Sequence, residues 1–227
     1  MQNSNLPLAL TMGDPAGIGP EIIVKSINKL KMTNYVVFGD AMVFENIIKI
    51  LDIPLRLNCI NSLSEAIFDK DVLNLLVTSE LKSKPNFGET SKESGRASYD
   101  AILETIKLAK QKKLLGVVTA PINKKALNLA NISFPGHTEI FSEHSKSNNV
   151  SMMLCNDSIK TVLVTLHCSM AEALKKICVE NEFKAIKNAY IGAKMFGIKD
   201  PIIAVAALNP HAGEMGLFGN EEKVVIE

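Results

Sequence analysis

The sequence predicts an α/β fold that combines a parallel or mixed sheet with a second subdomain. Short runs of valine, isoleucine and leucine alternate with longer stretches of helical spacing, which is the pattern of βαβ units. Two further apolar runs, residues 151–155 and 161–165, flank Asn156-Asp157-Ser158, a sequence typical of a hairpin turn. We therefore expect a single α/β unit over residues 1–227, built of two interleaved subdomains, with the hairpin in a subdomain at about residues 120–200.

The expected strands are short apolar runs bounded by polar or turn residues. Their high content of valine, isoleucine and leucine is typical of strands that are buried on both faces of a parallel sheet. In chain order they are residues 6–11, 35–38, 73–77, 115–119 and 202–207.

The expected helices carry apolar residues at three- and four-residue spacing. The first, residues 20–30, begins with Pro20, whose fixed backbone angle suits the first turn of a helix. Residues 94–112 and 180–196 show the same spacing over longer stretches. Residues 220–227 look like the first turns of an amphipathic helix that stops, so we expect the sequence to be incomplete at its C-terminus.

Composition and charge limit the classes of function. The 227 residues are 47% hydrophobic and 22% charged with a formal net charge of +1, which is ordinary for a globular protein with a sizeable core. No run of lysine and arginine interleaved with aromatic residues predicts a nucleic-acid surface, so any anionic partner is expected to be small. The N-terminal residues lack the features of a signal peptide, and no stretch has the length of a membrane span.

The cysteines predict a reducing compartment. They lack the paired CxxC spacing of a zinc site and the density of a secreted disulfide framework. We expect buried, reduced thiols and a cytoplasmic protein. The four residues are Cys59, Cys155, Cys168 and Cys178.

A glycine-rich loop at residues 11–21 joins the first expected strand to the first expected helix. The free backbone N–H groups and the positive helix end of such a loop suit a phosphate or a carboxylate. Its glycines do not follow the GxGxxG spacing of a dinucleotide-binding fingerprint, and they equally suit a tight turn that requires positive φ. If the loop binds a cofactor, the candidate contacts are Asp14, Gly17 and Gly19.

Residues 119–124 follow an expected strand, at the edge where open α/β sheets bind ligands. Lys124 in this segment either binds an anion or assists proton transfer, or it is a solvated lysine in the first turn of a helix. Solvation is the commoner role of a single lysine. The sequence does not identify the catalytic residue, and Lys124 is retained as a candidate.

Residues 134–139, with the sequence FPGHTE, place an imidazole beside a hydroxyl in a Pro-Gly turn. His137 and Thr138 can both donate hydrogen bonds to phosphate or carboxylate oxygens. A structural role is commoner for a single histidine, but the polar turn favours ligand binding. His144 lies in a charged, helix-like stretch and is expected to be exposed.

His167 and His211 are the candidate metal ligands. His167 ends one strand-like run and His211 follows another, and strand ends that open into a cleft can bring two neutral imidazoles to one metal ion. Pro210 and Gly213 bracket His211 in the sequence NPHAGE, and Glu214 is near enough to orient it. For each histidine taken alone a structural role in the core or in a turn is the commoner one, but the two together with the other segments favour metal binding.

With these segments in order, the sequence resembles the family of 4-hydroxythreonine-4-phosphate dehydrogenases, the oxidoreductases of pyridoxal-phosphate biosynthesis. The resemblance covers essentially the whole chain. The motifs PGHTE and NPHAGE are distinctive by themselves, and their order and spacing make a chance match improbable. The motifs are TMGDPAGIGPEI, ESGRAS, TAPINK, PGHTE, TLH and LNPHAGEMGLFGNEE.

The resemblance implies a two-subdomain mixed-sheet fold similar to isocitrate and isopropylmalate dehydrogenases. It also implies a homodimer with a shared active site and NAD or NADP as the hydride acceptor. His137 and Thr138 match the family's substrate-binding pair, and His167 and His211 match two of its three metal-binding histidines. The third histidine and further substrate-binding residues are expected beyond residue 227, so residues 1–227 alone are expected to bind metal weakly and to turn over negligibly.

The implied substrate is a small phosphorylated hydroxy amino acid, 4-phosphooxy-L-threonine. A divalent ion, Zn²⁺, Co²⁺ or Mg²⁺, would lower the pKa of the substrate hydroxyl while hydride passes from carbon to the nicotinamide. The product, 2-amino-3-oxo-4-phosphooxybutanoate, is a β-keto acid that decarboxylates to 3-amino-2-oxopropyl phosphate. Two alternatives stay open: a dehydrogenase of threonate or erythronate 4-phosphate, and an inactive metal- or phosphate-binding fragment.

Overall fold

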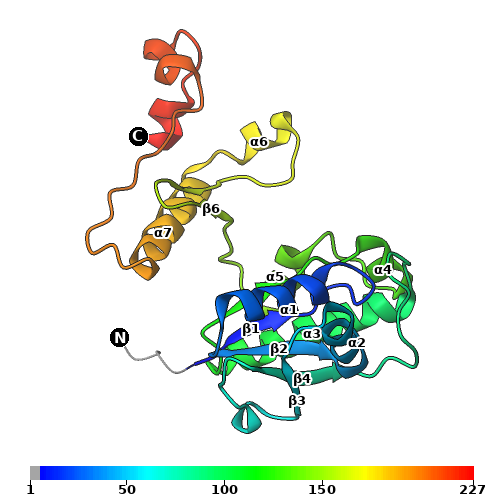
Figure 1. Ribbon diagram of the computed structural model, residues 1–227. Helices are drawn as coiled ribbons and strands as arrows, with labels where there is room; N and C mark the ends of the chain where they lie inside the picture. Colours follow the sequence, from blue (N-terminus) through cyan, green and yellow to red (C-terminus); the bar gives the residue numbers. More distant parts are fainter. Residues whose placement is uncertain (1–5) are drawn as a thin grey trace. The chain divides into compact units, whose positions relative to one another are not determined.

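The chain folds into two compact units, residues 1–147 and residues 148–227. The structure is a computed structural model that describes residues 6–227, and Figure 1 traces both units along the chain. The first unit contains a parallel sheet covered by helices, and the second contains an antiparallel hairpin with helices. The α/β fold class is therefore confirmed. The hairpin subdomain expected at about residues 120–200 overlaps both units.

A five-stranded sheet forms the centre of the first unit. Its order is β3-β4-β2-β1-β5, and every neighbouring pair is parallel. Four of the expected strands are confirmed with small shifts at their ends, and β3 is an addition that the sequence did not predict. The strands are β1 (Leu8–Thr11), β2 (Tyr35–Asp40), β3 (Arg56–Ile60), β4 (Val72–Ser79) and β5 (Gly116–Thr119).

Helices cover both faces of this sheet, because successive strand side chains point to opposite faces. Leu10 and Val37 belong to the core that the sheet shares with α1 and α2, whereas Ala9 and Val36 pack with α3. The helices expected at residues 20–30 and 94–112 are confirmed. The helices of this unit are α1 (Gly19–Leu30), α2 (Ala41–Leu51), α3 (Lys92–Lys110), α4 (Lys124–Leu129) and α5 (His137–Ser145), with a 3-10 turn at Leu63–Glu65.

A third apolar cluster joins α3 to the two short helices that follow β5. Ile102 and Ile106 of α3 pack with Leu127 of α4 and Ile140 of α5. Ile140 is fully buried, so α5 is anchored on α3 through its middle turn. Within residues 6–227 no helix combines the length and the hydropathy that crossing a bilayer requires.

The second unit contains the expected hairpin. Its two strands are antiparallel, and the Asn156 side-chain oxygen closes the turn by accepting the backbone N–H groups of Ser158 and Ile159 at 2.9 and 2.7 Å. The hairpin and the helix expected at residues 180–196 are therefore confirmed. The elements are β6 (Met153–Cys155), β7 (Lys160–Val162), α6 (Met170–Lys176), α7 (Val179–Met195), a 3-10 segment at Pro210–Gly216 and a π-helical turn at Glu222–Ile226.

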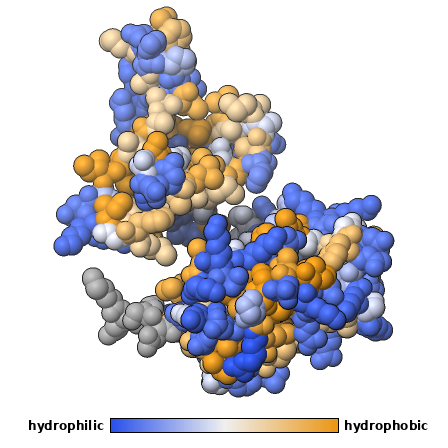
Figure 2. All heavy atoms as spheres, in the orientation of Figure 1, coloured by the Kyte–Doolittle hydropathy of each residue, from blue (hydrophilic) through white to orange (hydrophobic). Residues whose placement is uncertain are grey.

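The strand expected at residues 202–207 is wrong. These residues form no strand, although the run is as apolar as the true strands of the first unit. A strand needs a neighbour that completes its backbone hydrogen bonds, and the described part of the second unit pairs only β6 with β7. Ile202 is consequently 97% exposed, and apolar side chains lie at the surface of this unit in Figure 2.

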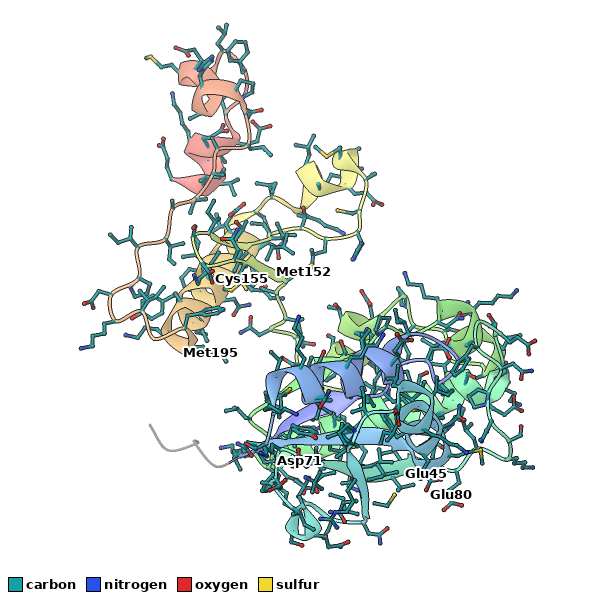
Figure 3. All side chains as sticks on the ribbon, viewed as in Figure 1. Glu45, Asp71, Glu80, Met152, Cys155 and Met195 are labelled. Atoms are coloured by element: carbon teal, nitrogen blue, oxygen red, sulfur yellow. The ribbon has the colours of Figure 1, made fainter. Side chains whose placement is uncertain are left out.

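The cysteines are free, as expected, but they are not buried. Cys59 and Cys155 are exposed, and Cys168 and Cys178 are half-buried. Cys59 lies on β3 at the edge of the sheet, and Cys155, labelled in Figure 3, ends the short strand β6. Two of the four thiols thus lie in strands, at positions that the core does not cover.

Candidate functional site

The loops that follow β1, β4 and β5 meet at the carboxyl edge of the parallel sheet. The Asp14 N–H donates to the Pro121 carbonyl at 2.9 Å, and the Gly88 N–H donates to the Ala16 carbonyl at 2.8 Å. These bonds connect the glycine-rich loop to residues 119–124 and to the connection before α3. Open α/β sheets bind ligands at this edge, so two of the candidate segments lie where a ligand is expected.

Close packing explains the glycines of the loop after β1. A Cβ atom on Gly13, whose φ is +72°, would collide with the loop after β5, and one on Gly19 would collide with the start of its own loop. A Cβ on Gly17 would come within 3.3 Å of Asp14 Cβ. The buried Asp14 carboxylate accepts the Ala16 N–H at 2.9 Å and so holds the turn. A tight turn thus accounts for these residues, and cofactor binding by Asp14, Gly17 and Gly19 stays a prediction.

Lys124 is the first residue of α4, and its side chain is exposed. Asn123 caps this helix by accepting the N–H groups of Lys125 and Ala126, and its side chain donates to the Thr90 hydroxyl at 3.2 Å. A cation at the N-terminus of a helix is disfavoured by the helix dipole, so helix stability does not explain Lys124. Within residues 6–227 no hydrogen bond or ion pair engages its ammonium group, which leaves it free to meet an anion.

His137 and Thr138 begin α5. The backbone N–H groups in the first turn of a helix have no partner within the helix. In α5 no side chain caps them. Both side chains are half-buried, and Nε2 of His137 is fully buried without a hydrogen-bond partner among the described residues. An imidazole nitrogen, a hydroxyl and free N–H groups therefore gather at the positive end of a helix, an arrangement that suits an anion.

Burial lowers the pKa of His137, because the protein around the ring disfavours the charged imidazolium. We expect its NMR titration midpoint to lie below about 6.5, the ordinary value for histidine, and to return to that value in denaturant. Since the unfolded state then binds the proton more readily, stability should decrease as the pH falls below about 6.5. A midpoint at or above 6.5 in the folded protein would contradict the burial of this ring.

His167 and His211 both lie in the second unit, and both are exposed. Their φ angles are +48° and +52°, so each lies in a left-handed turn rather than at the end of a strand. β7 ends at Val162, and the run before His211 is not a strand, so the expected strand-end positions are wrong. Within residues 6–227 no three histidine, cysteine or acidic side chains form a group that could hold a metal ion. The role of these two imidazoles in metal binding stays a prediction.

The turn that carries His211 is held by two glutamates that the sequence did not predict. Asn209 donates its backbone N–H to Glu222 at 2.6 Å and its side-chain N–H groups to Glu221 and Glu222 at 2.8 and 3.1 Å. The hydrogen bonds from Asn209 lower the pKa of Glu222, which is 4% exposed. Glu214, expected to orient His211, is exposed; its backbone carbonyl accepts the Leu217 N–H at 3.1 Å, but within residues 6–227 its carboxylate makes no hydrogen bond to His211. In the sequence, only the adjacent acidic residues Glu221 and Glu222 at the end of the motif could have indicated that glutamates hold this turn.

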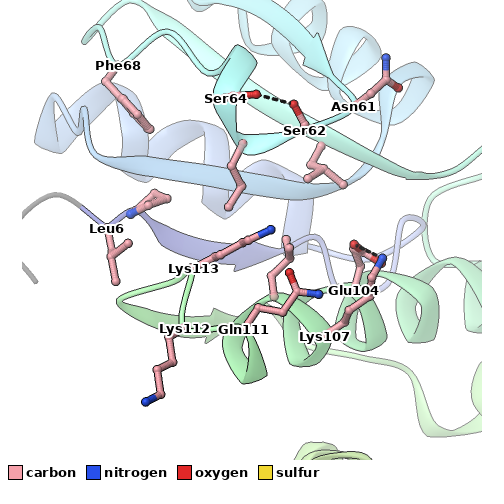
Figure 4. Close-up of a pocket in the computed structure, with 14 residues that line it drawn as sticks. Leu6, Asn61, Ser62, Ser64, Phe68, Glu104, Lys107, Gln111, Lys112 and Lys113 are labelled. Carbon is pink, nitrogen blue, oxygen red and sulfur yellow. Dashed lines mark hydrogen bonds and ion pairs between the residues drawn. The ribbon is translucent and has the colours of Figure 1, made fainter.

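The cavities of the two units lie away from these candidate residues. In the first unit a cavity of about 670 Å³ lies between α3 and residues 61–68, beside the amino ends of β1 and β5 (Figure 4). In the second unit a cavity of about 800 Å³ lies between the hairpin, α7 and residues 200–208. Glu182 lines this second cavity, and burial raises the pKa of its carboxyl group. None of the predicted substrate or metal residues lines either cavity.

Comparison with known proteins gives a consistent family. The model of the family described as pyridoxal phosphate biosynthetic protein PdxA matches residues 31–227. A 4-hydroxythreonine-4-phosphate dehydrogenase of Beijerinckia indica subsp. indica is 49% identical over 221 residues, which are 97% of this chain and 66% of that protein. A D-threonate 4-phosphate dehydrogenase of Pectobacterium atrosepticum is 35% identical over 96% of this chain and 68% of its own length.

A solved structure agrees with these sequences. The crystal structure of 4-hydroxythreonine-4-phosphate dehydrogenase from Klebsiella pneumoniae superposes with a TM-score of 0.89 at 33% identity. The match covers 100% of this chain and 70% of the solved chain. The chain thus spans about two thirds of the length of the curated relatives it matches.

Proposed function

The chain belongs to the family of pyridoxal phosphate biosynthetic protein PdxA, and from this premise we propose that the protein is a 4-hydroxythreonine-4-phosphate dehydrogenase. The proposed reaction oxidises 4-phosphooxy-L-threonine with NAD or NADP to 2-amino-3-oxo-4-phosphooxybutanoate. This β-keto acid then loses CO₂ to give 3-amino-2-oxopropyl phosphate. The 49% identical relative carries the name of this enzyme, which supports the proposal.

The observation that carries the proposed substrate class is the start of α5. The Nε2 atom of His137 is buried without a partner, which costs free energy unless a ligand pairs with it. Thr138 lies beside it, at a helix N-terminus with no side-chain cap. A phosphate group of the substrate would satisfy the Thr138 hydroxyl and the free N–H groups, and movement of the side chains that cover Nε2 would bring the imidazole to it as well. We therefore assign substrate binding to His137 and Thr138.

A dehydrogenase of this family requires a nicotinamide cofactor. We propose that the loop after β1 contacts it at Asp14, Gly17 and Gly19, because this loop lies at the carboxyl edge of the parallel sheet. The same loop packs against the backbone after β5, so only the outward N–H groups of the turn would be available. Preference for NAD or NADP is left open by the proposal.

We propose His167 and His211 as two ligands of a divalent metal ion. Both imidazoles are exposed and make no hydrogen bond within the described residues, so their donor type and availability fit a metal. Their number is incomplete, since catalytic zinc sites commonly use three protein ligands. When bound, Zn²⁺, Co²⁺ or Mg²⁺ would supply Lewis-acid chemistry by lowering the pKa of the substrate hydroxyl.

The oxidation removes a hydride and a proton from the substrate, and the proton has to be accepted by a group of the protein. Hydride leaves the substrate carbon with its electron pair for the nicotinamide ring, while the hydroxyl gives up its proton. Lys124 is our candidate for accepting that proton, a step that requires its neutral amine, because no other side chain within residues 6–227 pairs with its amino group beside the carboxyl edge of the sheet. A homodimer with a shared active site and a cytoplasmic location complete the proposal. The resemblance of the motifs supports the homodimer, and the cysteines, which are free, support the cytoplasmic location.

The second candidate function is oxidation of a sugar-acid phosphate such as threonate or erythronate 4-phosphate. The 35% identical relative named for D-threonate 4-phosphate supports it, because the same motifs serve both substrates. A further alternative is that residues 1–227 alone form an inactive metal- or phosphate-binding fragment.

Turnover of the full-length gene product on the three phosphates distinguishes these functions. At saturating NAD or NADP we expect kcat/KM for 4-phosphooxy-L-threonine to exceed that for either sugar acid by about 100-fold, because a site built to hydrogen-bond an amino group rejects analogues that lack it. Reduced cofactor and CO₂ should appear together. Absence of turnover on the amino acid would overturn the first proposal, and preferred turnover of threonate 4-phosphate would establish the second.

A further inference from the structure

Three aromatic rings form one contact group beside the proposed substrate residues. The ring centroids of Tyr99 and Phe134 are 6.2 Å apart in a stacked arrangement. His144 meets both rings edge-on, with centroid distances of 5.6 Å to Tyr99 and 5.8 Å to Phe134. We call Tyr99, Phe134 and His144 the aromatic clamp. His144 is half-buried, so its expected exposure is wrong, because its ring packs against Tyr99 and Phe134.

A hydrogen bond joins two side chains of the aromatic clamp. The Tyr99 hydroxyl and Nε2 of His144 are 2.5 Å apart. Burial raises the pKa of Tyr99 above its ordinary value, so the phenol keeps its proton. The phenol donates a hydrogen bond to Nε2 in the tautomer of His144 that carries its proton on Nδ1. The ammonium group of Lys110 adds a hydrogen bond of 3.4 Å to the His144 carbonyl, where a cation also suits the negative end of α5.

The clamp holds both ends of the segment that carries His137 and Thr138. Phe134 precedes α5 by three residues, and His144 lies in its last turn. Tyr99 comes from α3, which is packed on the central sheet, so it gives both contacts a rigid base. His137 lies about 10 Å from His144 along the helix axis, at 1.5 Å per residue. Because a helix moves as a rigid rod, rotation at its last turn would displace His137 and Thr138 at its first.

We propose that the aromatic clamp sets the position of the N-terminus of α5, and that Tyr99 and His144 are positioning residues for binding of the phosphorylated substrate. The proposal rests on the proposed function in one respect, because it takes His137 and Thr138 as substrate contacts. The burial of Ile140 holds α5 on α3 at one point. The clamp supplies the further contacts that stop the helix from pivoting about that point.

The direct test removes the hydrogen bond and keeps the ring. In the full-length protein Tyr99→Phe preserves the stacking on Phe134 and deletes the donor to His144. We expect KM for the phosphorylated substrate to rise by about 3- to 10-fold with little change in kcat, the range that one hydrogen bond spans. His144→Ala should do the same, and the double variant should be no worse than either single one. His144→Gln offers an amide oxygen to Tyr99 and should restore KM.

The matched control loses a tyrosine hydrogen bond elsewhere. Tyr35 is fully buried, and its hydroxyl donates to the Val72 carbonyl at 2.8 Å, away from α5. Tyr35→Phe should lower stability without moving KM, which separates positioning from a general loss of stability. If Tyr35→Phe and Tyr99→Phe raise KM equally, or if Tyr99→Phe leaves KM unchanged, the clamp has no positioning role. If Tyr99→Phe does not fold, His144→Ala and its rescue by His144→Gln decide the question.

Amide hydrogen exchange tests the clamp independently of the enzymatic activity. In Tyr99→Phe the amides of residues 137–145 should exchange faster while those of β1 and β2 keep wild-type rates. Wild-type protein that turns over none of the phosphates would defeat the proposed function and leave this comparison intact. Unchanged exchange in α5 would defeat the clamp even if the enzyme is active.

Discussion

His211→Ala is expected to reduce the proposed dehydrogenase activity of the full-length protein by more than about 100-fold while leaving the fold intact. Removing a group that merely orients a metal ligand already costs about 10- to 100-fold, and a ligand itself should cost more. The His211 side chain is exposed, and among residues 6–227 its ring contact is with Phe218, at a centroid distance of 6.5 Å. Stability should therefore change by less than about 1 kcal/mol, which is ordinary for a surface substitution.

Two measurements separate the metal role from a structural one. Bound metal in the purified protein should fall with the activity, while the thermal unfolding midpoint stays close to the wild-type value. Met215→Ala is the matched control, since Met215 is 88% exposed in the same turn, with φ of +55°. It should keep both metal and activity. A His211→Ala protein that unfolds would identify His211 as a structural turn residue, and one that keeps its metal would remove it from the ligand set.

Local patterns predicted the first unit well because its central strands β1, β2 and β4 are largely buried on both faces. Such strands are continuous apolar runs, as Tyr35–Asp40 shows, and the helices between them carry clear apolar faces. Arg56–Ile60 was missed because it is an edge strand with polar side chains on its open faces. The strand predicted at residues 202–207 is wrong for the opposite reason. Their composition is that of a strand, but strand formation depends on a neighbour that the run itself does not specify.

In the candidate site, too, local motifs predicted some residues, whereas contacts between distant parts of the chain were not predicted. His137 and Thr138 were found from a local motif, and α5 begins at that motif. The contacts of His144 were not predictable, because its partner Tyr99 lies 45 residues away and only packing brings the rings together. The glycines of the first loop looked like a ligand cradle, yet their close approaches are to the protein's own backbone. The sequence shows that glycine is needed at these positions, but it does not show whether a ligand or the protein's own backbone approaches them.

Gly95→Ala is expected to destabilise the first unit by about 3 kcal/mol, although helix propensity predicts the opposite sign. Gly95 lies inside α3, where alanine is normally more favourable than glycine by about 1 kcal/mol. A Cβ atom at this position would collide with the backbone carbonyl of Ala126 in α4. Backbone cannot change rotamer, so α4 would have to move away from α3, and overpacking of this kind costs about 1–3 kcal/mol or more.

Chemical denaturation of the variant decides between propensity and packing. The free energy of unfolding should fall in Gly95→Ala, and the matched variant Gly116→Ala should change it by less than about 1 kcal/mol, because the nearest atom to its added Cβ is 3.7 Å away. α4 carries Lys124 at its first residue and directly follows the loop that packs against the glycine-rich turn. Displacing α4 should therefore also weaken cofactor binding in the folded fraction. A Gly95→Ala protein more stable than wild type would show that α3 and α4 are not in the close contact on which this edge of the sheet depends.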